Sequence, residues 1–276
     1  MTDVSAVPLT IEGLFVLHQI FSFDWKAWRS VPAEESARIL ARTLPVLKDL
    51  ETGSSGVARS ALYSVLGHKG DLMVVHFRDS LHALNQVELK LAQTPLYDFL
   101  QPTFSYLSVV ELGLYESSMK TYAGLTEQGL EPHSQAWNGA IDEVLNRQRE
   151  AMAQRLFPAI PPAKHLCFYP MDRKRETGAN WYTLPMAERG RLMHDHGMIG
   201  RRYADRVRQV ISGSIGFDNW EWGVDLFADD PLVFKQLIYE MRFDEASALY
   251  ASFGPFYVGL RLPAEALKSW LAGTFV

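Results

Sequence analysis

The stretches LMVVHFRDSLHALN (72–85) and EWGVDLFADDPLVFKQ (221–236) carry the same order of features, and that order decides the fold class. Each begins with an apolar run of strand length. Each then passes through an acidic turn into residues with helical apolar spacing. In the first stretch, Asp79 or Ser80 can cap the helix. The two halves of the chain therefore each contain a strand followed by a helix.

The surrounding sequence extends both stretches into one six-element unit. In the first half we expect strands at 9–21, 60–65, 72–77 and 103–112, and helices that begin near 33 and 80. The second half repeats this order with HLCFYPM, LPMAERGRLMHDHG, RQVISGS, EWGVDLF, PLVFKQLIYEMRF and PFYVGLRL. WRSVPAEE (28–35) also mirrors WYTLPMAE (181–188). The sequence predicts an α+β fold of two ferredoxin-like β-α-β-β-α-β repeats.

A connecting segment separates the repeats. Residues 113–164 include PHSQAWNGAIDEVLNRQREAMAQRLFPAIPPAK, which is typical of a capped helix followed by a proline-rich linker. We therefore expect an N-terminal half over 1–131, a connecting helix and linker over 132–164, and a C-terminal half over 165–276.

Composition limits the classes of function. The 276 residues are 47% hydrophobic and 21% charged with a net charge of -5, which gives no whole-chain reason to expect nucleic acid. Cys167 is the only cysteine, so no internal disulfide can form, and a reducing cytoplasm fits. No apolar run of about 18 residues and no charged leader is present. We expect a soluble cytoplasmic protein without a membrane span.

The motif HDH (194–196) raises the question of a metal site. Positions two apart on a helix point about 200° apart, so His194 and His196 cannot both face one metal. Leu192 and Ile199 place His196 on the apolar stripe and leave His194 on the wet side. An inward histidine is more often a core residue with satisfied ring nitrogens. The alternative is a single axial ligand of haem, because nothing nearby supplies the three or four ligands that zinc requires.

Haem-like ligands also carry carboxylates, which need arginine or hydroxyl partners. YEMRFDEAS (239–247) offers Arg242 and Ser247 for this role. Arg242 could equally be a surface residue paired with Asp244 or Glu245.

Several motifs in order resemble those of coproheme decarboxylases, the haem-synthesis branch of the chlorite dismutase superfamily with a distal glutamine. The resemblance covers most of residues 9–263 and is loosest near 115–150. The motifs are FYPMDRKR (168–175), NWYTLPMAER (180–189), HDHGMIGRRYA (194–204), QVISGSIGFDNWEWGVDLFADDP (209–231) and YEMRFDEASALYASFGPFYVGLRLP (239–263).

The resemblance implies a dimeric α/β-barrel-type subunit, a porphyrin in the C-terminal half only, and a homopentamer. By position, His196 resembles the axial iron ligand, Tyr169 the oxidisable tyrosine and Gln209 the distal residue.

The resemblance also implies the groups around the propionates. Arg242 and Ser247 would lie with Tyr169 around one reactive propionate, and Met171 and Arg173 would lie near the other. Arg155 matches a further propionate-side arginine. Relatives usually carry lysine at position 173, and arginine there changes reach and hydrogen-bond geometry.

The implied reaction converts coproheme III, which acts as its own redox cofactor, into haem b. Two propionates lose carbon dioxide, hydrogen peroxide is the oxidant, and a Tyr169 radical takes hydrogen from the adjacent propionate. A transient contact with a coproporphyrin ferrochelatase is also implied.

Two alternatives remain open. Chlorite splitting or general haem peroxidase activity uses the same fold, although Gln209 lacks the positive charge that chlorite-splitting relatives place there. A non-catalytic haem carrier would need His196 but not Tyr169.

Overall fold

The computed structural model describes residues 7–52, 57 and 59–274, and its central feature is a closed antiparallel barrel. The sheet order is β10-β5-β11-β2-β3-β1-β4-β8-β9, and the additional pairing of β5 with β9 closes the ring, with β10 outside it. The strands are β1 (Thr10–Phe23), β2 (Ser60–Val65), β3 (Leu72–Arg78), β4 (Leu100–Gly113), β5 (His165–Arg173), β8 (Arg208–Gly213), β9 (Trp222–Ala228), β10 (Ala251–Phe253) and β11 (Tyr257–Arg261). A separate hairpin consists of β6 (Arg175–Glu176) and β7 (Ala179–Asn180).

The strand order confirms two ferredoxin-like repeats. Neighbours run β4-β1-β3-β2 in the first repeat and β11-β5-β9-β8 in the second, so each repeat has the order fourth, first, third, second. The repeats join where β2 pairs with β11 and where β4 pairs with β8. The division of the chain at 131 and 165 stays a prediction.

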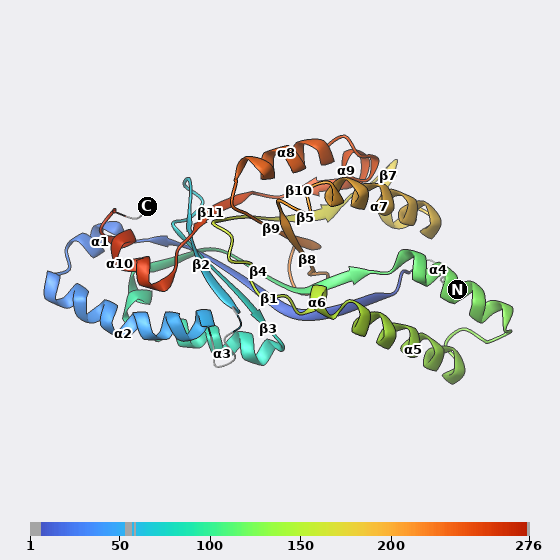
Figure 1. The fold of residues 1–276 in the computed structure, drawn as a ribbon, viewed down its shortest axis with the longest axis horizontal. Coiled ribbons are helices and arrows are strands. Elements are labelled where there is room, and N and C mark those ends of the chain that lie inside the picture. The colour runs from blue at the N-terminus through green and yellow to red at the C-terminus, as the bar shows by residue number, and fades with distance from the viewer. Residues whose placement is uncertain (1–6, 53–56, 58, 275–276) are drawn as a thin grey trace.

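Helices cover the outside of the barrel in two groups (Figure 1). Helices α2 and α3 cover the first repeat, whereas α7, α8 and α9 cover the second. The Ser80 side chain caps α3 by accepting the Ala83 N–H at 3.2 Å, as the sequence predicts. The helices are α1 (Trp25–Arg29), α2 (Ala33–Thr52), α3 (Leu81–Ala92), α4 (Tyr115–Glu127), α5 (Gln135–Ala151), α6 (Ala153–Leu156), α7 (Met186–Arg201), α8 (Leu232–Met241), α9 (Glu245–Tyr250) and α10 (Leu267–Leu271).

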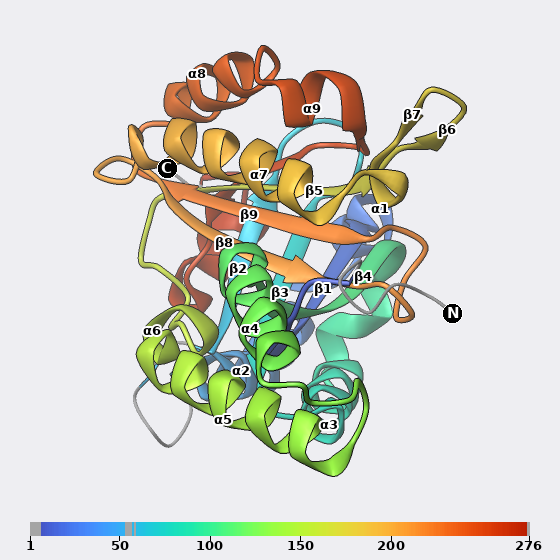
Figure 2. The same cartoon turned by 90° about the vertical axis from the view of Figure 1, so that its right-hand side faces the viewer.

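Alternation along each strand separates the barrel interior from the two helix-covered layers. On β5, Leu166 and Phe168 join the interior cluster, while Cys167 and Tyr169 join the cluster beneath α7 and α8. Figure 2 shows α7 and α8 side by side over β9 and β5. Within the described residues, no helix is long and apolar enough to cross a membrane.

A buried polar pair lies in the barrel interior and links the two repeats. His18 of β1 and Asp225 of β9 are fully buried, and His18 Nε2 lies 2.8 Å from Asp225 Oδ1. The His18 ring stacks on Phe168 of β5, with centroids 3.8 Å apart. A polar pair in an apolar barrel fixes one register, because any slip would leave both groups without a partner.

Replacing His18 by Ala should lower the free energy of unfolding by about 3 to 5 kcal/mol, because Asp225 would be left buried and unpaired. Urea denaturation measures this loss. The matched control is His82→Ala on the exposed face of α3, which should change stability by less than about 0.5 kcal/mol. Equal effects of the two substitutions would contradict a linking role for the buried pair.

Candidate functional site

The candidate site is the layer between the outer face of the second repeat's strands and helices α7, α8 and α9. Tyr169 and Met171 enter this layer from β5, and Ile211 enters it from β8. Leu237 and Met241 of α8 pack against the same cluster. We call this region the C-terminal layer.

His196 lies on the α7 face that the sequence predicts. Its side chain is 26% exposed and partly covered, whereas His194 is on the exposed side. His196 Nδ1 lies 2.9 Å from Asp244 Oδ2 and 3.4 Å from the Ser247 hydroxyl. The carboxylate selects the tautomer with hydrogen on Nδ1, which leaves the Nε2 lone pair for a metal or proton.

Asp244 is the functional residue that sequence reasoning missed, since it entered only as a surface partner for Arg242. Its Oδ1 caps α9 by accepting the Ser247 N–H at 3.0 Å, and its Oδ2 accepts the Ser247 hydroxyl at 2.9 Å. Burial acts to raise the pKa of Asp244, but hydrogen bonds from His196 and Ser247 outweigh it and hold the pKa below its ordinary value. Asp244 is therefore an anion behind His196.

Tyr169 is only 5% exposed and lies between aromatic rings. Its ring centroid is 4.5 Å from that of Phe256 and 5.8 Å from that of Phe253. Burial raises the pKa of Tyr169 well above its usual range, although the charge of Arg242 opposes this. The phenol therefore keeps its proton at neutral pH.

Arg242 lies beside the same aromatic group. Its guanidinium carbon is 3.7 Å from the centroid of the Phe253 ring, which is a cation–π contact. Asp244 is engaged with His196, and Glu245 pairs with Arg191 at 2.8 Å. Among the described contacts, neither carboxylate pairs with Arg242, so the surface ion pair considered from the sequence is not formed.

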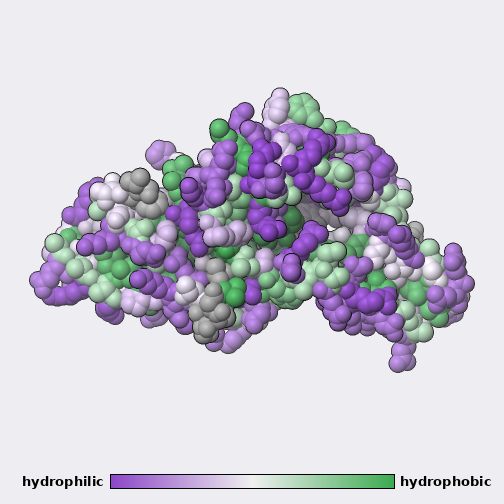
Figure 3. Space-filling view, viewed as in Figure 1, coloured by the Kyte–Doolittle hydropathy of each residue, from purple (hydrophilic) through white to green (hydrophobic). Residues whose placement is uncertain are grey.

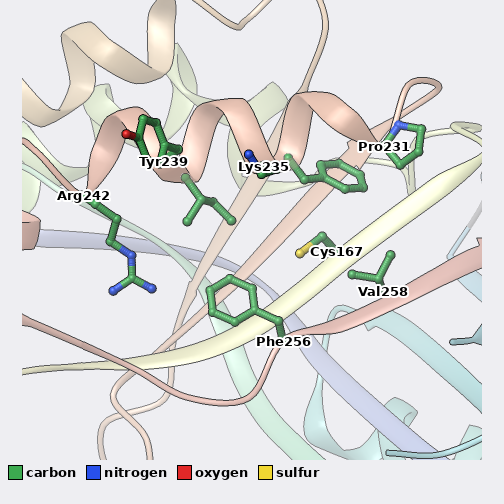
Figure 4. Close-up of a pocket in the computed structure, with 9 residues that line it drawn as sticks. Cys167, Pro231, Lys235, Tyr239, Arg242, Phe256 and Val258 are labelled. Carbon is green, nitrogen blue, oxygen red and sulfur yellow. The ribbon is translucent and has the colours of Figure 1, made fainter. Parts of the chain in front are cut away.

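A groove of about 430 Å³ runs along α8 beside β5 and β11. Figure 4 shows Arg242 at one end of it, with Phe256 facing α8 from the loop before β11. The lining is mostly apolar, and Lys235 and Arg242 add positive charge. The groove thus combines an apolar surface with two cations, and it lies next to the aromatic rings that pack against Tyr169.

Arg173 and Met171 lie at the far end of β5. Arg173 donates to the Ala246 carbonyl at 3.3 Å and to the Met193 sulfur at 3.0 Å. Its guanidinium carbon also lies 4.3 Å from the centroid of the Trp181 ring. Met171 packs against the C-terminal layer. Arg173 thereby connects β5 to α7 and α9.

Gln209 of β8 reaches across the C-terminal layer to α7. A Cβ added to Gly200 would lie 3.3 Å from the Gln209 amide nitrogen. Gly200 lies one helical turn after His196, so glycine keeps this part of the α7 surface flat. Arg155 lies elsewhere, exposed on α6 against β1 and β4, and the described contacts do not bring it to His196 or Tyr169.

Comparisons with known proteins agree with this architecture. Residues 34–262 match the family model of chlorite dismutase. The chain belongs to the chlorite dismutase family. A haem-binding protein from Thermus thermophilus is 38% identical with a TM-score of 0.83, covering 98% of this chain and 99% of that chain.

Two structures of chlorite dismutase from Candidatus Nitrospira defluvii share the fold at lower identity. A substituted form is 18% identical with a TM-score of 0.68, covering 95% of this chain and 96% of that chain. A complex with imidazole is 16% identical with a TM-score of 0.67, with the same coverage of both chains. At these identities the likeness extends to the fold of the chlorite dismutase family.

The residues of the C-terminal layer fit a haem-like group. Over residues 7–52, 57 and 59–274, no three His, Cys, Asp or Glu side chains gather as a metal site. A group that brings four nitrogens of its own needs only one imidazole, and His196 has its Nδ1 already anchored. Figure 3 shows the surface hollowed beneath α7, above β4 and α4.

Replacing Asp244 by Asn should reduce stability by about 1.5 to 3 kcal/mol at pH 7, because the carboxylate accepts three charge-assisted hydrogen bonds that a neutral amide can keep only in part. Since the pKa of Asp244 is lowered by folding, its contribution is present above the ordinary carboxyl pKa and is lost as pH falls through the lowered value.

The difference between Asp244→Asn and wild type should therefore shrink as pH falls from about 5 to about 2, as urea midpoints can show. Asp195→Asn is the control, since Asp195 is exposed and pairs with Arg191. A difference that stayed constant over this range would disprove the ionised Asp244.

Proposed function

We propose that the protein is a coproheme decarboxylase, which uses hydrogen peroxide to convert two propionates of Fe-coproporphyrin III into the vinyl groups of haem b. The observation that carries this proposal is the position of Tyr169. A protonated, desolvated phenol lies beside Arg242 through shared contacts with Phe253, in the same layer as His196. The 38% identity to a haem-binding protein over nearly the whole chain supports a haem-like ligand.

The proposed reaction balances for each propionate. The side chain loses its carboxyl carbon as carbon dioxide and one hydrogen from the methylene bonded to the porphyrin ring, leaving a vinyl group. The two electrons released reduce one hydrogen peroxide to two waters, and one proton is taken up when the propionate starts as a carboxylate. The porphyrin iron of the substrate supplies the redox chemistry.

Tyr169 would transfer the hydrogen. Loss of a proton and an electron from its hydroxyl makes a radical that takes a hydrogen atom from the propionate carbon. This restores the phenol, and the carbon-centred product releases carbon dioxide and a second electron. Burial favours this route, because the surrounding rings of Phe253 and Phe256 exclude water from the reacting atoms.

Other residues would hold the substrate. His196 would bind the iron through Nε2, with Asp244 fixing the ring. Arg242 and Ser247 would hold one propionate, and Met171 and Arg173 the region of the other. The resemblance also assigns Arg155 to the propionate side, but the described contacts place this exposed α6 residue against β1 and β4, so its role stays a prediction.

Gln209 would face the opposite side of the iron from His196. Its neutral amide argues against chlorite splitting, because it supplies no positive charge to an oxyanion. The homopentamer and the contact with a coproporphyrin ferrochelatase stay predictions.

When purified protein is mixed with ferric coproheme and hydrogen peroxide, the porphyrin should lose carbon dioxide in two successive steps. Mass spectrometry of the porphyrin measures both losses. Chlorite added to the haem-loaded protein should release oxygen far more slowly, because Gln209 is neutral. Rapid oxygen release without decarboxylation would favour chlorite splitting. Stable haem binding with neither reaction would favour a carrier.

Tyr169→Phe should separate binding from chemistry. The substitution removes one oxygen, so stability and coproheme affinity should change by only about 0.5 to 1.5 kcal/mol. Decarboxylation should fall to background, because phenylalanine has no O–H to lose, and peroxide should bleach the porphyrin instead.

The matched control is Tyr257→Phe. Tyr257 is similarly buried at 6% exposure but faces the barrel interior from β11. The Tyr257→Phe protein should decarboxylate coproheme at near the wild-type rate. A Tyr169→Phe protein that formed haem b as fast as the control would exclude the tyrosyl route.

A further inference from the structure

Glu111 is a carboxylic acid at the edge of the C-terminal layer. On β4, Tyr106, Ser108 and Val110 are buried on the interior side of the barrel, so alternation directs Glu111 outward. It lies near the end of β4, two residues before the last strand residue Gly113.

Gly213 of β8 makes room for this carboxylate. A Cβ at Gly213 would lie 2.4 Å from Glu111 Oε2, so any other residue would displace the side chain. Gln209 and Ile211 lie four and two residues before Gly213 and share its face of β8. Glu111 therefore faces the same layer as the candidate distal residue.

A second carboxylate lies directly across the strands, because Glu12 of β1 is the register partner of Glu111. Glu12 accepts a hydrogen bond from the Thr10 hydroxyl at 2.5 Å and lies 3.7 Å from the Arg149 guanidinium of α5. Among the described contacts no cation pairs with Glu111. Of the two acids, Glu12 is therefore the one with a cation beside it.

Burial, and next the charge of Glu12, raise the pKa of Glu111 to about 7. Tyr115 of α4 is a further titratable neighbour among the described residues, and its hydroxyl feels the charges of Arg189, Arg173 and Glu111. Glu111 thus faces one carboxylate on β1, one phenol on α4 and the more distant arginines of α7 and β5.

We propose that Glu111 is a specificity-determining residue that governs how tightly the C-terminal layer holds a porphyrin carrying several carboxylates. Protonated, it borders the layer as a neutral group. Ionised, it repels the propionates and weakens binding, more for the four carboxylates of a coproporphyrin than for the two of haem b. This inference rests on the proposed function, because it takes the porphyrin to be the ligand.

The test compares wild type with Glu111→Gln, using tryptophan fluorescence quenching by metal-free coproporphyrin from about pH 6 to about pH 8.5. Wild-type affinity should fall by about three- to tenfold more than that of Glu111→Gln over this range. Glu116→Gln is the matched control, since Glu116 on α4 has a 79% exposed side chain paired with Lys120. It should follow the wild-type profile.

Glu12→Gln gives an independent readout. Removing the neighbouring charge should lower the pKa of Glu111, so the loss of affinity should begin at lower pH than in wild type. If Glu111→Gln fails to fold, the shift of the pH profile in Glu12→Gln tests the role of Glu111 in its place.

Superimposable pH profiles of wild type and Glu111→Gln would overturn the inference. A Glu111-dependent profile in a protein that never decarboxylates coproheme would overturn the proposed function and leave the inference standing. Failure of both proteins to bind coproporphyrin at any pH would overturn both.

Discussion

The two junctions between the repeats, β2 with β11 and β4 with β8, are the constraint on which the rest of the structure depends. They close the sheet, so successive residues of the barrel strands face alternately the barrel interior and its outer surface. Phe168 faces inward onto His18, and its neighbour Tyr169 must then face outward. The β4–β8 junction is short, with two register pairs, and the Ser108–Ser212 hydrogen bond at 2.8 Å reinforces it from inside.

The two repeats fill the equivalent layer differently, and this difference favours the second repeat as the place of the candidate site. The shared WRSVPAEE and WYTLPMAE motifs align α2 with α7, so Gly200 corresponds to Leu47 and His196 to Thr43. Leu47 is 1% exposed and fills the layer of the first repeat. Gly200 leaves the equivalent space to the Gln209 amide, a flexible group that a ligand can displace. One repeat therefore keeps a packed core where the other keeps an adaptable surface.

Local patterns in the sequence predict the elements that local physics determines. The repeat, the α3 cap and the inward face of His196 follow from apolar spacing and capping chemistry. The β6–β7 hairpin and β10 were not predicted, because two- and three-residue strands have no periodicity to read. Contacts between distant segments could not be predicted either. Asp244 reaches His196 across 48 residues, and Glu111 meets Gly213 only because β4 and β8 pair. The resemblance named the site residues, but it gave Asp244 no part behind the histidine. Such partners depend on the register and on helix packing, which the chain specifies only as a whole.

The acidic groups of the C-terminal layer are all withdrawn from water, but their pKa values shift in opposite directions. Tyr169 and Glu111 have raised pKa values because burial disfavours their anions and, among the described contacts, no cation pairs with them closely enough to reverse this. Asp244 is also withdrawn from water, yet three hydrogen bonds from His196 and Ser247 keep it ionised. Fixed negative charge therefore stands behind the imidazole of His196, whereas Tyr169 keeps its proton and Glu111 changes charge near neutral pH.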